Sequence, residues 1–357
     1  MKIYETGLAD VAKAKALIDE DLAAYAKQWQ ESSDAGSRMA IEAYCQILLR
    51  GGKRLRGVLA MQSYYAYGGT DDTVALGAAR ALELIQAYLL VLDDIADRSD
   101  TRRGGPSAHR LAETMSRAAN MHGDMTHYAT MQVMNAAQSA AHKAALELLA
   151  LPVNDTVARA SLQSLHQNIE ITSIGQMNDI YNEATNETLD ESAIERVLTQ
   201  KSAYYTFINP LELGACLAGQ EGLDQTVRDY ALHAGCAFQI ADDIIGTFGD
   251  EMTTGKGAND DIREGKMTLI AQYGLAHTDD AQRNTLRATM GNQQATDDEC
   301  DQVRQILTTS GAYSYATERR DWHADQARQA LTEPTSFDPL FGQFLNELVT
   351  YVTTRQA

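Results

Sequence analysis

Apolar residues recur at helical spacing along most of the chain, between short breaks rich in Gly, Ser, Thr, Asn and Asp. Side chains three and four positions apart lie on one face of a helix, so this spacing predicts amphipathic helices. No convincing run of alternating apolar and polar residues lies between hairpin turns, as a strand would require. The pattern therefore predicts an all-α fold.

The breaks also place the predicted helices. The predicted helices lie at 8–30, from about 37 to 50, from about 70 to the acidic stretch before 98, from about 107 to 120, from about 124 to 150, and onward from about 156. Another helix leads to Lys201, and a further apolar helix covers residues 231–250. The remaining chain reads as amphipathic helices with a structural role.

Residues 82–106, LELIQAYLLVLDDIADRSDTRRGGP, join an apolar helix to a cluster of charges. Apolar side chains surround this helix almost completely, which predicts a buried position. At about 100° per residue, Asp93 and Asp97 project from one face, and Asp94 lies beside them. Buried carboxylates need a metal ion or arginine as compensation. A solvated helix end is the alternative, because the pattern is short.

A second predicted helix, at residues 231–250, is also apolar and also carries a pair of adjacent aspartates. Gln239, Asp242 and Asp243 share its polar side with Gly246, so the carboxylate one turn further on is missing. If this helix and the first face each other across a bundle, their carboxylates repel, and divalent cations are then needed.

Basic residues occur in short polar segments. Gly51 and Gly52 precede Lys53 and Arg56, and glycines let backbone amides approach a phosphate closely. Further cations follow the acids or lie next to apolar segments: Arg102, Arg103, Lys201, Lys256 and Lys266. Taken alone, the segment from Gly51 to Gly57 is better explained as a helix-capping loop with solvated bases, and Lys201 is either a surface lysine or a pocket cation. Together with apolar walls, these basic segments predict a pocket for a molecule with a diphosphate head and a hydrocarbon tail.

Composition limits the class of protein. A net charge of −19 argues against nonspecific nucleic-acid binding and against an anionic membrane surface. The four cysteines are far apart and read as reduced core residues of a cytoplasmic protein. The N-terminal residues have no apolar signal core, and no apolar run reaches about 18 residues, so no stable membrane insertion is expected.

Six motifs occur in an order that resembles the trans-isoprenyl diphosphate synthases, the all-α prenyltransferases. They are GGKRLRG, DDIADRSDTRRG, GQMND, KSAYYTFINPLELGA, FQIADDIIGTFGD and GKGANDDIREGK, from Gly51 to about Leu269. The resemblance implies one domain over residues 1–357, built as an isoprenoid-synthase-type helical bundle around a central cavity. It also implies a homodimer.

The family pattern implies a head-to-tail condensation of isopentenyl diphosphate with an allylic diphosphate such as dimethylallyl, geranyl or farnesyl diphosphate. It implies Mg²⁺, three ions per site, held by Asp93, Asp94, Asp97, Asp242 and Asp243. It assigns Arg102, Lys201 and Lys256 to the allylic diphosphate, and Lys53, Arg56 and Arg103 to isopentenyl diphosphate. Gln239 and Lys266 match pocket positions of the family, and Asp179 is a weaker candidate.

Three positions depart from the common pattern. Gln86 stands where many members have histidine, and its amide can donate the same hydrogen bond. Ser202 stands where threonine is frequent, and Gly246 replaces the third aspartate of the second motif. Because the FGD sequence ending at Asp250 resembles a branch of the family without that aspartate, we do not expect Gly246 to inactivate the protein.

The residues before the first motif bear on product length. In the family the growing tail runs along the first acidic helix, so Tyr88 and Leu89 are expected to form the floor of the cavity. A bulky Tyr88 with no insertion in the motif resembles geranylgeranyl (C20) synthases more than C15 or long-chain enzymes. Tyr88 as ordinary core packing is the alternative.

Four other functions compete with this interpretation. A farnesyl or longer polyprenyl diphosphate synthase shares the same motifs. A class I terpene cyclase also uses DDxxD, but no NDxxSxxxE-like motif is evident here. A non-catalytic regulatory subunit of a heteromeric synthase usually lacks motif residues that are intact in this chain, and a plain helical scaffold would need none of them.

Overall fold

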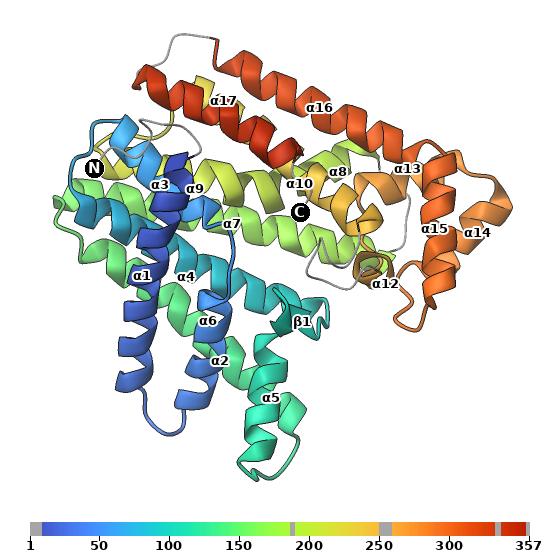
Figure 1. The fold of residues 1–357 in the computed structure, drawn as a ribbon, viewed down its shortest axis with the longest axis horizontal. Helices are drawn as coiled ribbons and strands as arrows, with labels where there is room; N and C mark the ends of the chain where they lie inside the picture. The colour runs from blue at the N-terminus through green and yellow to red at the C-terminus, as the bar shows by residue number, and fades with distance from the viewer. Residues whose placement is uncertain (1–8, 186–189, 250–258, 333–336, 355–357) are drawn as a thin grey trace. The chain divides into compact units, whose positions relative to one another are not determined.

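The computed structural model describes residues 9–185, 190–249, 259–332 and 337–354. Among these residues the regular structure is helical, except for one short antiparallel hairpin of β1 (Thr101–Arg102) and β2 (Gly105–Pro106) (Figure 1). The predicted all-α class is therefore confirmed. The hairpin was not predicted, because strands of two residues leave no alternating pattern in the sequence.

The chain divides into two compact units. The first comprises Met1–Ser164 and Pro210–Gly222, and the second comprises Leu165–Asn209 and Leu223–Ala357. Two of the three boundaries fall inside helices, α7 (Asp155–Thr185) and α9 (Asn209–Leu217), and the third lies in the connection after α9. The single domain expected over residues 1–357 stays a prediction.

The first unit is organised around α4. Its helices before α7 are α1 (Ala9–Ser32), α2 (Arg38–Leu49), α3 (Leu55–Ala66), α4 (Asp72–Ala96), α5 (Ala108–Ala118) and α6 (Met125–Leu149). α4 contacts α1, α2, α3, α5 and α6. It begins where the Asp71 side chain accepts a hydrogen bond from the Thr73 amide, an N-cap that satisfies a free helix-end donor. Because five helices pack against α4, most of its apolar surface is buried, as the sequence predicts.

α4 has a second property that follows from its apolar sequence. Among the described helices, it alone is long and apolar enough to cross a membrane by length and composition. Within its most apolar window, 67% is buried inside the fold, as in the core helix of a folded protein.

The second unit is organised around α10 (Gln225–Phe248). Its other elements are the rest of α7, then α8 (Glu191–Val197), η1 (Leu198–Ile208), α12 (Asp260–Glu264), α13 (Leu269–His277), α14 (Asp280–Thr289), α15 (Asp297–Thr309), α16 (Ala312–Ala330) and α17 (Pro339–Thr354). α10 contacts η1, α12, α13, α16 and α17, so the second acidic helix is central in its own unit (Figure 1).

η1 is an 11-residue π-helix, a rare and wider form of helix that is often found at functional sites. It approaches two neighbours closely through their glycines. A Cβ on Gly175 of α7 would lie 2.4 Å from the Lys201 amide nitrogen, and a Cβ on Gly235 of α10 would lie 2.4 Å from Ala203 Cα. Only glycine fits these two contacts, which together fix the position of Lys201 and Ser202 on η1.

The four cysteines Cys45, Cys216, Cys236 and Cys300 are buried and free. Burial raises the pKa of the Cys45 and Cys236 thiols to about 12, which keeps them protonated and unreactive near neutral pH. The expectation that the cysteines are core residues is confirmed.

Candidate active site

The first acidic motif lies at the C-terminal end of α4. Asp94 is fully buried, whereas Asp93 and Asp97 are partly exposed. Asp97 is the residue that ends the helix, and its amide donates to the Asp93 carbonyl oxygen at 2.8 Å. The motif therefore presents two carboxylates towards a partly open side and one towards the core.

Arg102 of β1 carries the charge that compensates the buried acid. Its Nε donates to Asp94 Oδ1 at 2.6 Å, and its Nη2 lies 3.4 Å from Asp93 Oδ2. Burial disfavours the charge of Arg102, but the carboxylates of Asp94, Asp93 and Asp97 outweigh burial and raise the pKa of the guanidinium. Of the two compensations that the sequence predicts, arginine pairing is thus present in the protein itself.

Arg103 brings the glycine-rich segment to the same place. Its Nη1 donates to the carbonyl oxygens of Arg50 at 3.1 Å and of Gly51 at 3.3 Å. A Cβ on Gly52, which has a φ of +99°, would lie 3.1 Å from Arg103 Cζ. The hairpin and the Gly51–Gly52 turn therefore pack directly on each other, which the sequence alone did not reveal.

Several cations surround Arg103. Burial, followed by the charge of Arg54 and those of Arg102 and Arg56, lowers the pKa of Arg103 to about 10, against the opposing effect of Glu83. A guanidinium whose charge is disfavoured by its neighbours gains most from an anion. This cluster of cations is suited to a diphosphate.

Arg54 was not singled out in the sequence, although it lies between Lys53 and Arg56. It is buried and forms ion pairs with Glu83 at 3.0 Å and with Asp19 at 2.7 Å. Both flanking cations are partly exposed. Of the three bases in this segment, the middle one joins α3 to α1 and α4, and the outer two remain partly open to solvent.

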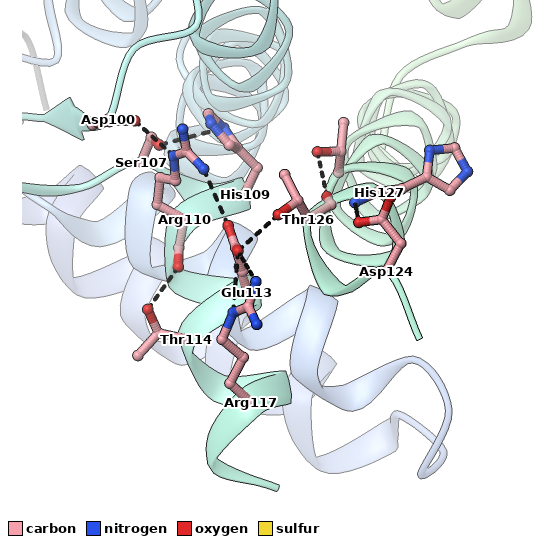
Figure 2. A network of polar contacts seen from close by, with 11 residues as sticks. Asp100, Ser107, His109, Arg110, Glu113, Thr114, Arg117, Asp124, Thr126 and His127 are labelled. Atoms are coloured by element: carbon pink, nitrogen blue, oxygen red, sulfur yellow. Dashed lines mark hydrogen bonds and ion pairs between the residues drawn. The ribbon is translucent and has the colours of Figure 1, made fainter. Parts of the chain in front are cut away.

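The hairpin is held in place from both sides. Arg50 Nη1 donates to the carbonyl oxygens of Arg102 at 2.9 Å and of Pro106 at 2.7 Å. On the other side, Arg110 of α5 donates to Asp100 at 2.6 Å and to Glu113 at 3.1 Å (Figure 2). These contacts fix the strand that carries Arg102 and Arg103.

Glu113 is the centre of the network in Figure 2. Its carboxylate accepts hydrogen bonds from Arg117 at 2.6 Å, Arg110 at 3.1 Å and Thr126 at 2.8 Å. The bonds from Arg117 and Thr126, with that from Arg110, lower the pKa of Glu113 to about 2. Glu113 therefore ties α5 to the start of α6.

The expected chain-length residues Tyr88 and Leu89 are less buried than the residues of α4 that precede them. The residues from Ala81 to Ala87 are buried, and this run includes Gln86, whereas Tyr88 and Leu89 are half-buried. Partial exposure does not distinguish a cavity floor from core packing, and the role of Tyr88 and Leu89 in setting product length stays a prediction.

In the second unit, Lys201 and Ser202 lie on η1. Lys201 Nζ donates to Asp179 Oδ2 of α7 at 2.5 Å, so the weaker candidate Asp179 is joined to a stronger one. Ser202 Oγ donates to Gln239 Oε1 at 2.8 Å, and Gln239 Nε2 donates to Asp243 Oδ1 at 2.8 Å. The structure thus brings together five of the predicted positions of this unit through two short hydrogen-bonded chains.

Asp243 is the buried carboxylate of the second motif. Burial raises its pKa to about 7, the charges of Asp261 and Asp242 act in the same direction, and Gln239 and Lys266 oppose them. Lys266 Nζ lies 3.5 Å from Asp261 Oδ1 and 2.9 Å from Glu264 Oε2. Within the polar segment that the sequence predicts as a loop, Asp260–Glu264 form the short helix α12.

Lys256, an expected ligand of the allylic diphosphate, and Asp250, which ends the FGD sequence, lie outside the described residues. Asp93 and Asp242 belong to different units, and the expectation that their helices face each other stays a prediction. Within the described ranges, no group of three or more His, Cys, Asp or Glu residues is arranged as a metal-ligand cluster. The mutual repulsion of the carboxylates around Asp243 nevertheless fits a divalent cation, which would relieve it.

Comparison with known proteins agrees with these features. The family model of polyprenyl synthetase matches residues 38–307. A geranylgeranyl diphosphate synthase of Saccharolobus solfataricus is 30% identical over 82% of this chain and 83% of its own. A geranylfarnesyl diphosphate synthase of Aeropyrum pernix is 28% identical over 88% of this chain and 93% of its own.

Among solved structures, a geranylgeranyl pyrophosphate synthase of Corynebacterium glutamicum superimposes with a TM-score of 0.89 at 28% identity. The match covers 96% of this chain and 99% of that one, and that crystal structure contains isoprenyl diphosphate and magnesium. Family model, relatives and fold agree, and the chain belongs to the polyprenyl synthetase family as a prenyltransferase.

Proposed function

We propose that the protein condenses isopentenyl diphosphate head-to-tail with an allylic diphosphate, in the presence of Mg²⁺, to give geranylgeranyl diphosphate. The observation that carries this proposal is the meeting of three segments in the first unit: the acids at the end of α4, the Arg102–Arg103 hairpin and the Gly51–Gly52 turn. Carboxylates suited to a metal ion and cations suited to a diphosphate thus lie next to each other.

The allylic substrate is assigned to Asp93, Asp94, Asp97, Arg102, Lys201, Lys256, Asp242 and Asp243. In this assignment Asp93 and Asp97, which are partly exposed, are the groups of α4 that turn towards the diphosphate. Arg102 keeps the charge of Asp94 balanced from the core side. Mg²⁺, when bound, withdraws charge from the departing diphosphate, so that the allylic carbon–oxygen bond breaks more readily.

Isopentenyl diphosphate is assigned to Lys53, Arg56 and Arg103, with the Gln86 amide beside it. The lowered pKa of Arg103 supports this role, since an anion at this place restores the preference for the charged form. The double bond of isopentenyl diphosphate attacks the allylic cation, and the departing diphosphate takes the proton that is lost.

Gln239 and Ser202 orient Asp243 in this scheme through the hydrogen-bonded chain that joins η1 to α10. Lys266 balances the acids of α12. Three Mg²⁺ ions per site are proposed from the family resemblance, and their ligands would be the five aspartates of the two motifs.

A homodimer is the proposed assembly. The proposal rests on the family resemblance, and Leu146 and Leu149 on α6, which are 62% and 55% exposed, are candidates for residues of the contact. The molar mass in solution, measured by light scattering across a dilution series, tests this assignment.

Product sizing tests the function. Purified protein is incubated with isopentenyl diphosphate, Mg²⁺ and each of dimethylallyl, geranyl and farnesyl diphosphate, and the prenyl chains are separated by length. A C20 product from all three primers supports the proposal. A C15 end product, or a ladder beyond C20, identifies a farnesyl or longer polyprenyl synthase instead, for which the relatives of several product lengths provide precedent. No product with any primer favours a regulatory subunit.

A further inference from the structure

The second acidic motif lacks one carboxylate. Asp93 is followed by Asp97 in the first motif, whereas Asp242 is followed at the same spacing by Gly246. Residues four apart in a helix lie on one face, one turn apart. The side of α10 next to Asp242 therefore carries no acid of its own at this point.

The empty position on α10 is filled from another helix. A Cβ added to Gly246 would lie 1.8 Å from Asp261 Oδ2 and 2.8 Å from Asp261 Cγ, whereas an ordinary contact is 3.4–4 Å. Turning the carboxylate about its Cβ–Cγ bond leaves Cγ in place, so a side chain at position 246 would require Asp261 to take another χ1 rotamer. The Asp261 carboxylate thus occupies the volume into which a side chain at position 246 would project.

The helix that carries Asp261 is fixed to its surroundings. Arg304 of α15 donates to the Thr247 carbonyl oxygen at 2.8 Å and also to Asn259, so it connects the end of α10 to the start of α12. The Gly291 amide donates to the Ile262 carbonyl oxygen at 2.9 Å. The backbone that carries Asp261 is therefore held by hydrogen bonds from α15 and from Gly291.

The neighbours of Asp261 belong to the site described above. The negative charge of Asp261, like that of Asp242, raises the pKa of Asp243. Lys266 Nζ lies 3.5 Å from Asp261 Oδ1. Asp261 is thus a third carboxylate on the Asp242–Asp243 side of α10, although it comes from a different element and was not among the predicted site residues.

We propose that Asp261 replaces the missing third aspartate of the second motif as a carboxylate for the Mg²⁺ ions of the diphosphate, and that Gly246 is glycine because it must leave room for it. This inference rests on the proposed function. It accounts for the expectation that Gly246 does not inactivate the protein. It also predicts that Gly246→Asp alone is harmful, because two carboxylates would then compete for the same volume.

The test measures Mg²⁺ binding without turnover. Thermal unfolding is followed at a fixed concentration of inorganic pyrophosphate and increasing Mg²⁺. The Mg²⁺ concentration that gives half of the maximal stabilisation is the half-point. The variants are Asp261→Asn, Asp261→Ala, Gly246→Asp and the double variant Gly246→Asp/Asp261→Ala. Asp260→Asn, which removes the neighbouring charge on α12, is the matched control. Prenyl transfer is measured in parallel.

Asp261→Asn and Asp261→Ala are expected to raise the half-point for Mg²⁺ about tenfold. Gly246→Asp alone is expected to raise it as well and to lower the melting temperature without metal. The double variant returns a single carboxylate to the vacated volume, so its half-point is expected within about threefold of the wild type, a non-additive result. Asp260→Asn is expected to leave the half-point unchanged.

Asp261→Asn is nearly isosteric, so a fold defect does not obscure the result. An unchanged half-point in Asp261→Asn, or a double variant no better than its two parents, overturns the role of Asp261 while leaving the proposed function intact. A wild type without any Mg²⁺-dependent stabilisation and without prenyl product overturns both.

Discussion

Arg102 Nε lies 2.6 Å from Asp94 Oδ1, and Asp94 is fully buried at the end of the central helix of its unit. A two-residue strand therefore compensates the most enclosed carboxylate of the first motif. Because a charged group in the interior needs a partner, the hairpin and α4 are stabilised as one structural unit.

Arg102→Gln is expected to destabilise the protein by about 3 kcal/mol, since removing one partner of a buried ion pair leaves the other charge poorly compensated. Urea unfolding at neutral pH measures this change in the free energy of unfolding. Arg287→Gln, at an exposed arginine of α14, is the matched control and is expected to change the stability by less than about 0.5 kcal/mol. Equal stabilities of the two variants would contradict the assignment.

Glu113 should give the protein a stability that depends on pH. Its pKa is about 2 in the folded protein and lies near its ordinary value of 4.5 in the unfolded chain. A carboxyl group with a lowered pKa stabilises the folded state above the unfolded pKa, and this contribution is lost as the pH falls from about 4.5 towards 2.

Glu113→Gln is therefore expected to cost about 1 kcal/mol at pH 7 and progressively less below pH 4.5, because exposed ion pairs contribute little individually. The measurement is the difference in the free energy of unfolding between wild type and variant at several pH values. Glu318→Gln, at an exposed position of α16, is the control. A difference that grows on acidification would be inconsistent with this network.

His323 gives a second pH dependence, with its own cause. Its Nδ1 lies 3.0 Å from His233 Nδ1, and burial, followed by the charges of His233 and Arg319, lowers the pKa of His323 below its ordinary value of 6.5. The carboxyl groups of Asp229 on α10 and Glu195 on α8 oppose this effect at His233, but burial outweighs them and lowers the pKa of His233 as well. The folded state thus prefers neutral imidazoles, and protonation favours unfolding.

Stability is accordingly expected to fall as the pH drops below about 6.5, by up to about 1.4 kcal/mol per pH unit for this group. His323→Gln is expected to flatten this part of the stability curve, whatever its effect at pH 8. His122→Gln, at an exposed histidine, is the control. The same slope in His323→Gln and wild type between pH 6.5 and 5 would refute the role of this pair.

Tyr88→Ala is expected to lengthen the product, because the proposed function assigns the half-buried Tyr88 ring to the floor of the space into which the tail grows. The product distribution with farnesyl diphosphate as primer is compared between wild type and variant. Tyr181→Ala, at a tyrosine that is 66% exposed, is the control and should leave the product length unchanged. Identical products from wild type and Tyr88→Ala would show that Tyr88 does not set the depth.

The sequence predicted a large part of this arrangement. The apolar surface of α4 predicted a buried helix, and the cost of burying Asp94 predicted a compensating cation. Which arginine supplies it was not predictable, because the hairpin that positions Arg102 has strands too short for any periodic pattern. The π-helical form of η1 was missed for a similar reason, since its apolar residues look like those of an α-helix.

Asp261 was missed because its role depends on a contact across elements. Within the segment EMTTGKGANDDIREGKMTLI it was one of several charged residues of a polar loop. The one signal in the sequence was Gly246, an absent side chain at a position where a carboxylate is usual. Only the three-dimensional contact between Gly246 and Asp261 connects the two observations.

Incorporation of isopentenyl diphosphate into prenyl product, by wild type and by Asp93→Asn and Asp242→Asn variants of unchanged melting temperature, tests the central claim most directly. The account predicts Mg²⁺-dependent chain elongation by the wild type and a loss of about a thousandfold in each variant, the scale expected when a group that stabilises developing charge is removed. No elongation by the wild type, or full activity in either variant, would contradict it.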